Sequence, residues 1–97
     1  MTPVSLTPCA REDLADICDS VALDKPGAAD RLLQEIISRF QLISENPKIG
    51  RVRAELGVDI RCVNVGNYII FYRLVHEAVS ILRVLHGARD ITSFLWQ

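Results

Sequence analysis

Apolar residues in the first part of the chain recur with the spacing of an α-helix. Thr7 followed by Pro8 is typical of a helix start, with Thr7 as the N-cap and Pro8 in the first turn. Glu12 and Asp13 add negative charge near this end, where the helix dipole favours it. The Asp24–Gly27 segment interrupts the pattern. Four residues at i, i+3, i+4 and i+7 share one face: Leu14, Ile17, Cys18 and Val21.

A second and longer helical pattern follows this break. We expect Asp24 to cap it and Pro26 to lie in its first turn, and Asn46-Pro47 to end it. The segment 48–57 has no clear period and is interpreted as a crossover loop. The apolar stripe of this helix is wide enough to face both a sheet and the first helix. Its members are Leu32, Leu33, Ile36, Ile37, Phe40 and Ile43.

The rest of the chain has the pattern of β-strands. Strands are predicted at 59–65, 68–75 and 78–86, with hairpin turns at Gly66-Asn67 and His76-Glu77. The middle strand is apolar on both faces except for Arg73, so we expect it to lie centrally in the sheet. A short extended stretch at 4–6 precedes the helices. Residues 90–97 allow no more than a turn or two of helix.

The predicted order is therefore β-α-α-β-β-β in a single domain spanning residues 1–97. This order favours an α+β fold in which a helical hairpin packs on one face of an antiparallel sheet. The opposite face and the sheet edges would be open to solvent or to a partner. Hydrophobic residues make up 49% of the chain, which is a large share for a small domain and allows for apolar surface that a partner covers.

Composition excludes several classes of protein. The net charge is −1, so nothing indicates direct, sequence-specific binding of nucleic acid. The three cysteines, Cys9, Cys18 and Cys62, lack metal or redox spacing, and we expect free thiols in a reducing compartment. No cofactor is expected, since no Gly-rich phosphate loop occurs, and two histidines ten residues apart do not indicate a metal site. The N-terminus has no signal-peptide pattern and no apolar run approaches about 18 residues, which favours a cytoplasmic protein with no membrane contact.

Arginine is the chemistry-bearing residue that stands out. Only Lys25 and Lys48 of the 11 basic residues are lysines, and arginine suits bidentate contacts with anions. Three arginines fall on three consecutive predicted strands, and others could border them. They are either a basic patch for binding a target or an acidic partner, or solvated and ion-paired sheet residues. The set is Arg61, Arg73, Arg83, Arg89, Arg51 and Arg53.

A series of short motifs extends along nearly the whole chain. They are Ala10, Asp13-Leu14, Ile17, Pro26, Ala28-Ala29, Asn46-Pro47, Gly50-Arg51-Val52-Arg53, Glu55-Leu56, Arg61, the run from Val65 to Arg73 and the run from Ile81 to Asp90. In this order they resemble ParE-type toxins of type II toxin–antitoxin modules, within the RelE/ParE superfamily. The resemblance implies a RelE-like fold and a cognate antitoxin that binds and neutralises the toxin. It also implies DNA gyrase as the target.

The main alternative is the RelE branch, whose members cleave mRNA on the ribosome. That chemistry requires a group to activate the 2′-hydroxyl and cations for the phosphoryl charge. If the chain were a ribonuclease, the resemblance would point to Arg89, His86 and Arg61. The position after the hairpin tyrosine is Ile69, however, where RelE-type enzymes place an arginine, and no tyrosine follows Tyr72. We therefore predict that the protein acts by binding rather than as an enzyme.

A third alternative is a protein-binding module without toxicity. His86 at a strand end is also typical of a residue with a structural hydrogen bond. We expect Tyr68 and Tyr72 to belong to the core. Phe94 and Trp96, which flank Leu95 where RelE-type enzymes carry a tyrosine, are expected to close the core near the C-terminus.

Overall fold

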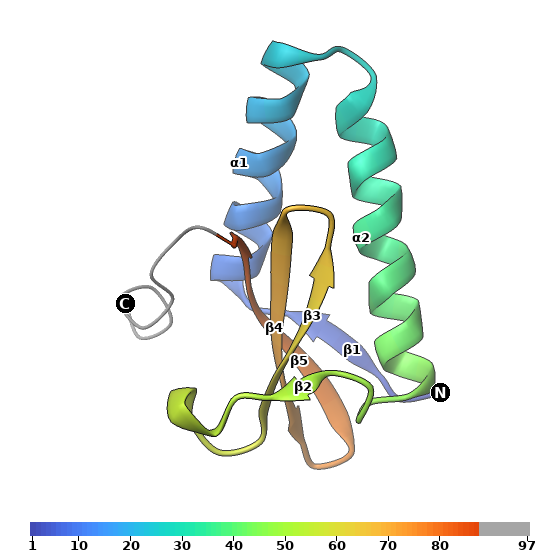
Figure 1. Cartoon of the computed structure of the whole chain (residues 1–97). Helices are drawn as coiled ribbons and strands as arrows, with labels where there is room; N and C mark the ends of the chain where they lie inside the picture. Colours follow the sequence, from blue (N-terminus) through green and yellow to red (C-terminus); the bar gives the residue numbers. More distant parts are fainter. Residues whose placement is uncertain (88–97) are drawn as a thin grey trace.

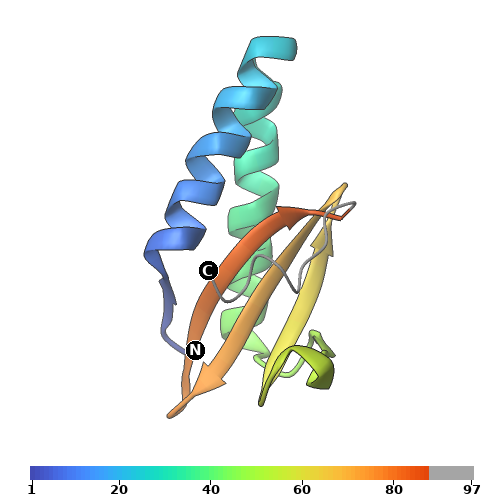
Figure 2. The same ribbon diagram turned by 90° about the vertical axis from the view of Figure 1, so that its left-hand side faces the viewer.

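The structure is a computed structural model that describes residues 1–87; the expectations for Arg89 and for residues 90–97, including Phe94, Leu95 and Trp96, lie outside this range. Two helices form one layer and a five-stranded sheet forms the other (Figures 1 and 2). The predicted α+β fold is confirmed. The elements are β1 (Val4–Leu6), α1 (Pro8–Asp24), α2 (Ala28–Glu45), β2 (Arg51–Val52), a 3₁₀ turn η1 (Ala54–Leu56), β3 (Ile60–Val65), β4 (Tyr68–Val75) and β5 (Ala78–His86).

The sheet is mixed, which corrects the expectation of a purely antiparallel one. Its order is β1-β5-β4-β3-β2, and β4 is central as predicted. The strands β2 to β5 pair antiparallel, but β1 pairs parallel with β5, with Val4 opposite Val79 and Leu6 opposite Ile81. A strand of three residues carries no signal for the direction of its partner. The direction is set by the helical hairpin and the meander that separate β1 from β5.

The helical hairpin begins at the predicted residue, but the turn between its two helices differs from the prediction. Thr7 is the N-cap of α1, and its Oγ1 accepts a hydrogen bond from the Ala10 amide at 3.1 Å. Asp24 does not cap α2 but is the last residue of α1, and Pro26 precedes α2 rather than lying in its first turn. Gly27 is the N-cap, with φ of 88°. Glycine adopts this left-handed conformation without steric cost, so the chain reverses there instead of at Asp24.

Most of the core lies between the helices and the sheet. Ile36 and Ile43 of α2 pack against Ile70, Tyr72 and Ile81, all fully buried, which confirms Tyr72 as a core residue. Tyr68 is half-buried and packs against this cluster. The opposite sheet face is not simply open as expected. It carries a second buried cluster of Leu56, Ile60, Cys62, Phe71 and Leu85, in which η1 contributes Leu56.

Two tight turns connect the last three strands where the sequence predicts them. Gly66 has φ of 56°, and His76 and Glu77 have φ of 49° and 61°. Positive φ in the turn matches the twist of a two-residue hairpin. The β4–β5 register then shifts between Phe71 and Tyr72, which leaves Leu82 of β5 without a direct partner. This β-bulge bends β5 beside the start of α1.

Candidate functional site

Arg83 forms a nearly buried ion pair with a helix. Its Nε and Nη2 each lie 2.7 Å from a carboxylate oxygen of Asp13 on α1, and the two side chains are 15% and 10% exposed. Asp13 also accepts a hydrogen bond from the Val84 amide at 3.1 Å. The hydrogen bonds that Arg83 donates to Asp13 raise the pKa of the Arg83 guanidinium. Asp13 thus accepts hydrogen bonds from β5 at the sheet edge, beyond the point where β1 ends. This role differs from the interaction with the helix dipole that the sequence predicts for it.

Arg61 lies on the face of the sheet that the helices cover. It pairs with Tyr72 across β3 and β4, and Tyr72 belongs to the core between helices and sheet. Its Nη1 donates to the carbonyl oxygens of Lys48 at 3.3 Å and Gly50 at 3.0 Å. Arg61 therefore holds the loop between α2 and β2 in place.

Tyr72 fixes the same loop from inside the core. Its hydroxyl donates to the Pro47 carbonyl at 2.7 Å and accepts from the Gly50 amide at 2.9 Å. Burial raises the pKa of this phenol. A Cβ added to Gly50 would lie 2.6 Å from the Tyr72 hydroxyl and 2.9 Å from the Cys62 carbonyl, so only glycine allows this approach.

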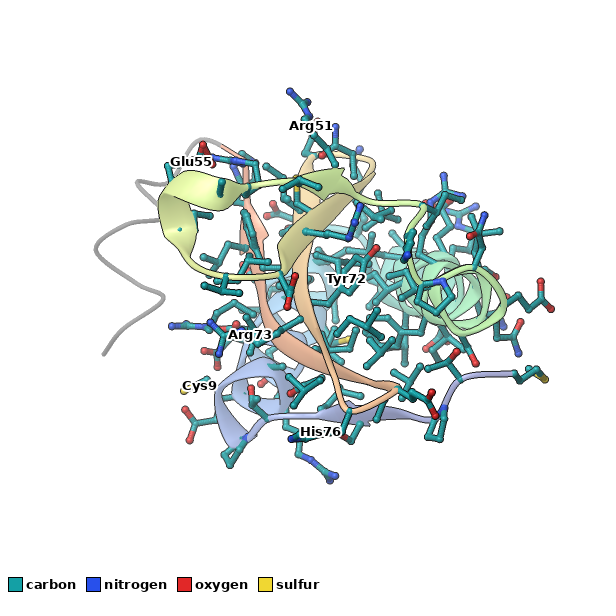
Figure 3. The ribbon with its side chains drawn as sticks, turned by 90° about the horizontal axis from the view of Figure 1, so that it is seen from below. Cys9, Arg51, Glu55, Tyr72, Arg73 and His76 are labelled. Atoms are coloured by element: carbon teal, nitrogen blue, oxygen red, sulfur yellow. The ribbon has the colours of Figure 1, made fainter. Side chains whose placement is uncertain are left out.

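Arg73 and Arg53 lie on the opposite face, around Phe71. Figure 3 shows Tyr72 and Arg73 pointing to opposite sides of β4. Arg73 pairs with Ile60, and its Nε donates to the Val58 carbonyl at 3.2 Å. The Arg53 guanidinium carbon lies 5.9 Å from the Phe71 ring centre, and its Nε lies 2.6 Å from Glu55. The hydrogen bond with Glu55 raises the pKa of Arg53.

The five arginines of this set that the structure describes therefore do not form one patch. Arg61 faces the helix layer, whereas Arg53 and Arg73 border the second cluster on the other face. Arg83 reaches α1, and Arg51 is exposed on the edge strand β2. Arg89 is outside the described residues. Alternation along the strands predicts such a split, because neighbouring strand positions point to opposite faces.

His86 stands at the end of β5 against Tyr68. The two rings are 5.4 Å apart at 84°, an edge-to-face contact. They line a pocket of about 280 Å³ between α1 and the ends of β4 and β5. Neither His86 nor Tyr68 indicates this pocket from its place in the sequence. The helical spacing of Asp13, Asp16 and Ser20 along one flank of α1 was the available signal for it.

The described residues show no metal-ligand cluster and no membrane-spanning helix. Residues 1–87 contain no group of three or more His, Cys, Asp or Glu side chains arranged to hold a metal ion. No helix in this range is long and apolar enough to cross a membrane. Cys9, Cys18 and Cys62 are free thiols, as predicted.

Comparison with known proteins identifies the family. Residues 4–91 match the model for "ParE toxin of type II toxin-antitoxin system, parDE". Toxin ParE1 of Mycobacterium tuberculosis is 32% identical over 89 residues, covering 89% of this chain and 90% of that protein. Toxin RelE3 of Caulobacter vibrioides is 32% identical over 89 residues, covering 90% of this chain and 96% of that protein.

Solved structures agree on the fold. A structure described as "Chromosomal ParDE TA system from P. aeruginosa" has a TM-score of 0.76 at 20% identity, over 89% of this chain and 96% of that one. The complex RelBE2 from Mycobacterium tuberculosis has a TM-score of 0.62 at 28% identity, over 88% and 96%. The chain belongs to the ParE toxin family of type II toxin–antitoxin systems.

Proposed function

We propose that this ParE-family toxin inhibits DNA gyrase by binding to it in the cytoplasm, and that a cognate antitoxin neutralises it. Family membership supports a toxin, and one structural observation supports binding over RNA cleavage. The described candidates for phosphoryl transfer, Arg61 and His86, lie apart and are engaged elsewhere.

The separation follows from the strand register. Arg61 is opposite Tyr72 on β4, whereas His86 is opposite Tyr68. Four positions along a strand span about 13 Å, and β4 also lies between the two residues. The Arg61 guanidinium points to the loop carbonyls of Lys48 and Gly50. A phosphate next to His86 would gain no charge stabilisation from Arg61, and cleavage of RNA requires such stabilisation at the reacting phosphate.

The similar solved structures support the proposal that an antitoxin binds this chain. Those proteins are described as a ParDE system and as a RelBE2 toxin–antitoxin complex. In this chain Val52 of the edge strand β2 is 53% exposed, and Leu23, Val58 and Val75 also expose apolar surface. A short exposed edge and scattered apolar side chains are features that a wrapping partner covers.

The target hypothesis is tested by gyrase supercoiling with the purified toxin. We expect inhibition that is lost on adding the antitoxin, and filamentous cells with an SOS response on induction. Among the arginines of the sheet, the exposed Arg51 is the first choice for a target contact. Arg51→Ala should raise the half-inhibitory concentration at least about 10-fold if the contact is desolvated. Arg31→Ala, an exposed arginine of α2, is the matched control and should leave inhibition unchanged.

The RelE-type alternative has its own test, since Toxin RelE3 is also a relative. Primer extension on translating ribosomes should show no toxin-dependent cuts. Codon-specific cuts that Arg61→Ala and Arg89→Ala abolish would replace the gyrase proposal with ribosome-dependent RNA cleavage. Unimpaired supercoiling at saturating toxin, with no RNA cuts, would favour a binding module without toxicity.

A further inference from the structure

The pocket between α1 and the ends of β4 and β5 carries polar groups that the described fold leaves unused. Asp16 and Ser20 lie on one flank of α1, and Tyr68 faces them from β4. Within residues 1–87 the Asp16 carboxylate forms no ion pair, and the hydroxyls of Ser20 and Tyr68 form no hydrogen bond. Figure 1 shows α1 running beside the end of β5, which forms the other wall.

The floor of the pocket is apolar. Ile17 and Val84, which belong to the core between the helices and the sheet, are buried at 9% and 1% exposed. The pocket thus combines an apolar base with hydrogen-bonding groups at its rim. A long side chain with a methylene stem and a charged head matches this arrangement, because the stem is apolar and the head forms hydrogen bonds.

The negative charge at the rim of the pocket favours a positively charged ligand. Asp13 also lines the pocket, but Arg83 compensates its charge. Within residues 1–87, Asp16 has no ion pair of this kind. Arg11 is the only basic residue of α1, which carries four other carboxylates besides Asp13: Glu12, Asp16, Asp19 and Asp24. This side of the molecule therefore attracts positive charge.

The size of the pocket suits a single long side chain. It measures about 280 Å³ and is partly open, which is near the lower end of the range for small-molecule sites. The described residues also lack a cluster of metal ligands. Anchor residues at protein interfaces fill pockets of this kind, and arginine is frequent among them.

We propose that this pocket receives a lysine or arginine side chain of the antitoxin, with its stem on Ile17 and Val84 and its charged head at Asp16 and the Tyr68 hydroxyl. The inference rests on the proposed neutralisation by an antitoxin and adds the chemistry of one contact. Ser20 supplies a further acceptor for the same head group.

The experiment measures the Kd between the full chain and the purified product of the adjacent antitoxin gene. Asp16→Asn should weaken binding about 10- to 100-fold, the range for a hydrogen bond to a charged group. Tyr68→Phe should weaken it about 3- to 10-fold. Asp19→Asn is the matched control, because it makes the same charge change on the same helix outside the pocket; it should change Kd less than about 2-fold. Thermal unfolding of each variant checks the fold.

A double-mutant cycle identifies the occupant. Each lysine and arginine of the antitoxin is changed to alanine and combined with Asp16→Asn. One basic residue whose loss costs nothing further in the Asp16→Asn background supports the proposal. If Asp16→Asn binds like Asp19→Asn, or couples to no basic residue, the pocket assignment is overturned while neutralisation stands. If the wild-type chain does not bind the antitoxin at all, both proposals fall.

Discussion

The two edges of the sheet are closed by different chemistry. At the β1 edge, α1 supplies the partners: the Thr7 hydroxyl donates to the Leu82 carbonyl at 2.8 Å, and Asp13 binds Arg83 and the Val84 amide. At the β2 edge, two exposed residues form the last strand, and Tyr72 and Arg61 hold the loop before them from within. The first edge is sealed by a nearly buried charge, and the second remains accessible. The stability of the fold should therefore depend more on the first edge than on the second.

The largest effect is expected at the β1 edge. Asp13→Ala should lower the free energy of unfolding by about 3–5 kcal/mol, because it removes a nearly buried carboxylate that accepts two hydrogen bonds from Arg83 and leaves the Val84 amide without this acceptor. Urea unfolding of the variant measures this. Asp19→Ala is the control, since Asp19 is exposed on the same helix. Equal stability of the two variants would show that the carboxylate does not seal this edge.

Tyr72→Phe tests the buried part of the β2 edge. The variant leaves the Gly50 amide and the Pro47 carbonyl without their buried partner, so we expect a loss of about 1–3 kcal/mol. Hydrogen exchange should accelerate at the Gly50 amide. Tyr68→Phe is the comparison, because its hydroxyl has no hydrogen bond within the described residues, and its stability should match the wild type.

The same phenol predicts a pH dependence. Burial raises the pKa of Tyr72 above the ordinary value of 10.0. The unfolded chain then loses this proton at lower pH than the folded chain, so the contribution to stability is complete below about pH 10 and is lost as pH rises further. Alkaline unfolding curves should therefore differ between wild type and Tyr72→Phe above pH 10. Parallel curves across that range would contradict the prediction.

Arg61→Ala should have a smaller effect. Its two hydrogen bonds to the Lys48 and Gly50 carbonyls are partly exposed, and we expect a loss of no more than about 1 kcal/mol. The change should be local, with faster hydrogen exchange in β2 and unchanged exchange in β5. A global loss as large as that of Asp13→Ala would mean that the two edges contribute equally.

The smallest effect is expected for the Arg53–Glu55 pair. Its side chains are 28% and 61% exposed. Glu55→Gln should change stability by about 0–1 kcal/mol, and the difference should shrink as salt is added. Thermal unfolding at low and high ionic strength measures this. A large loss of stability in Glu55→Gln that persists at high salt would show that this ion pair stabilises the β2 edge.

The sequence predicts the positions of the helices and strands better than it predicts which strands and side chains pair with one another. Helical spacing and turn residues located both helices and the last three strands, because these signals are local. The parallel pairing of Val4 with Val79 has no local signal, and β2 has only two residues. The split of the arginines follows from alternation, but the engagement of Arg61 by loop carbonyls does not. Asp13 was interpreted through the helix dipole because its partner, Arg83, is 70 residues away.

The pairing of β1 with β5 also orders events during synthesis. Residues 4–6 leave the ribosome first, but their partners at 79–81 are made near the end of the chain. The nascent N-terminal strand therefore waits unpaired while both helices and most of the sheet emerge. Contacts of this sequence separation slow folding because a long loop must close before they form. The β5 edge of the sheet can therefore be completed only when translation is nearly finished.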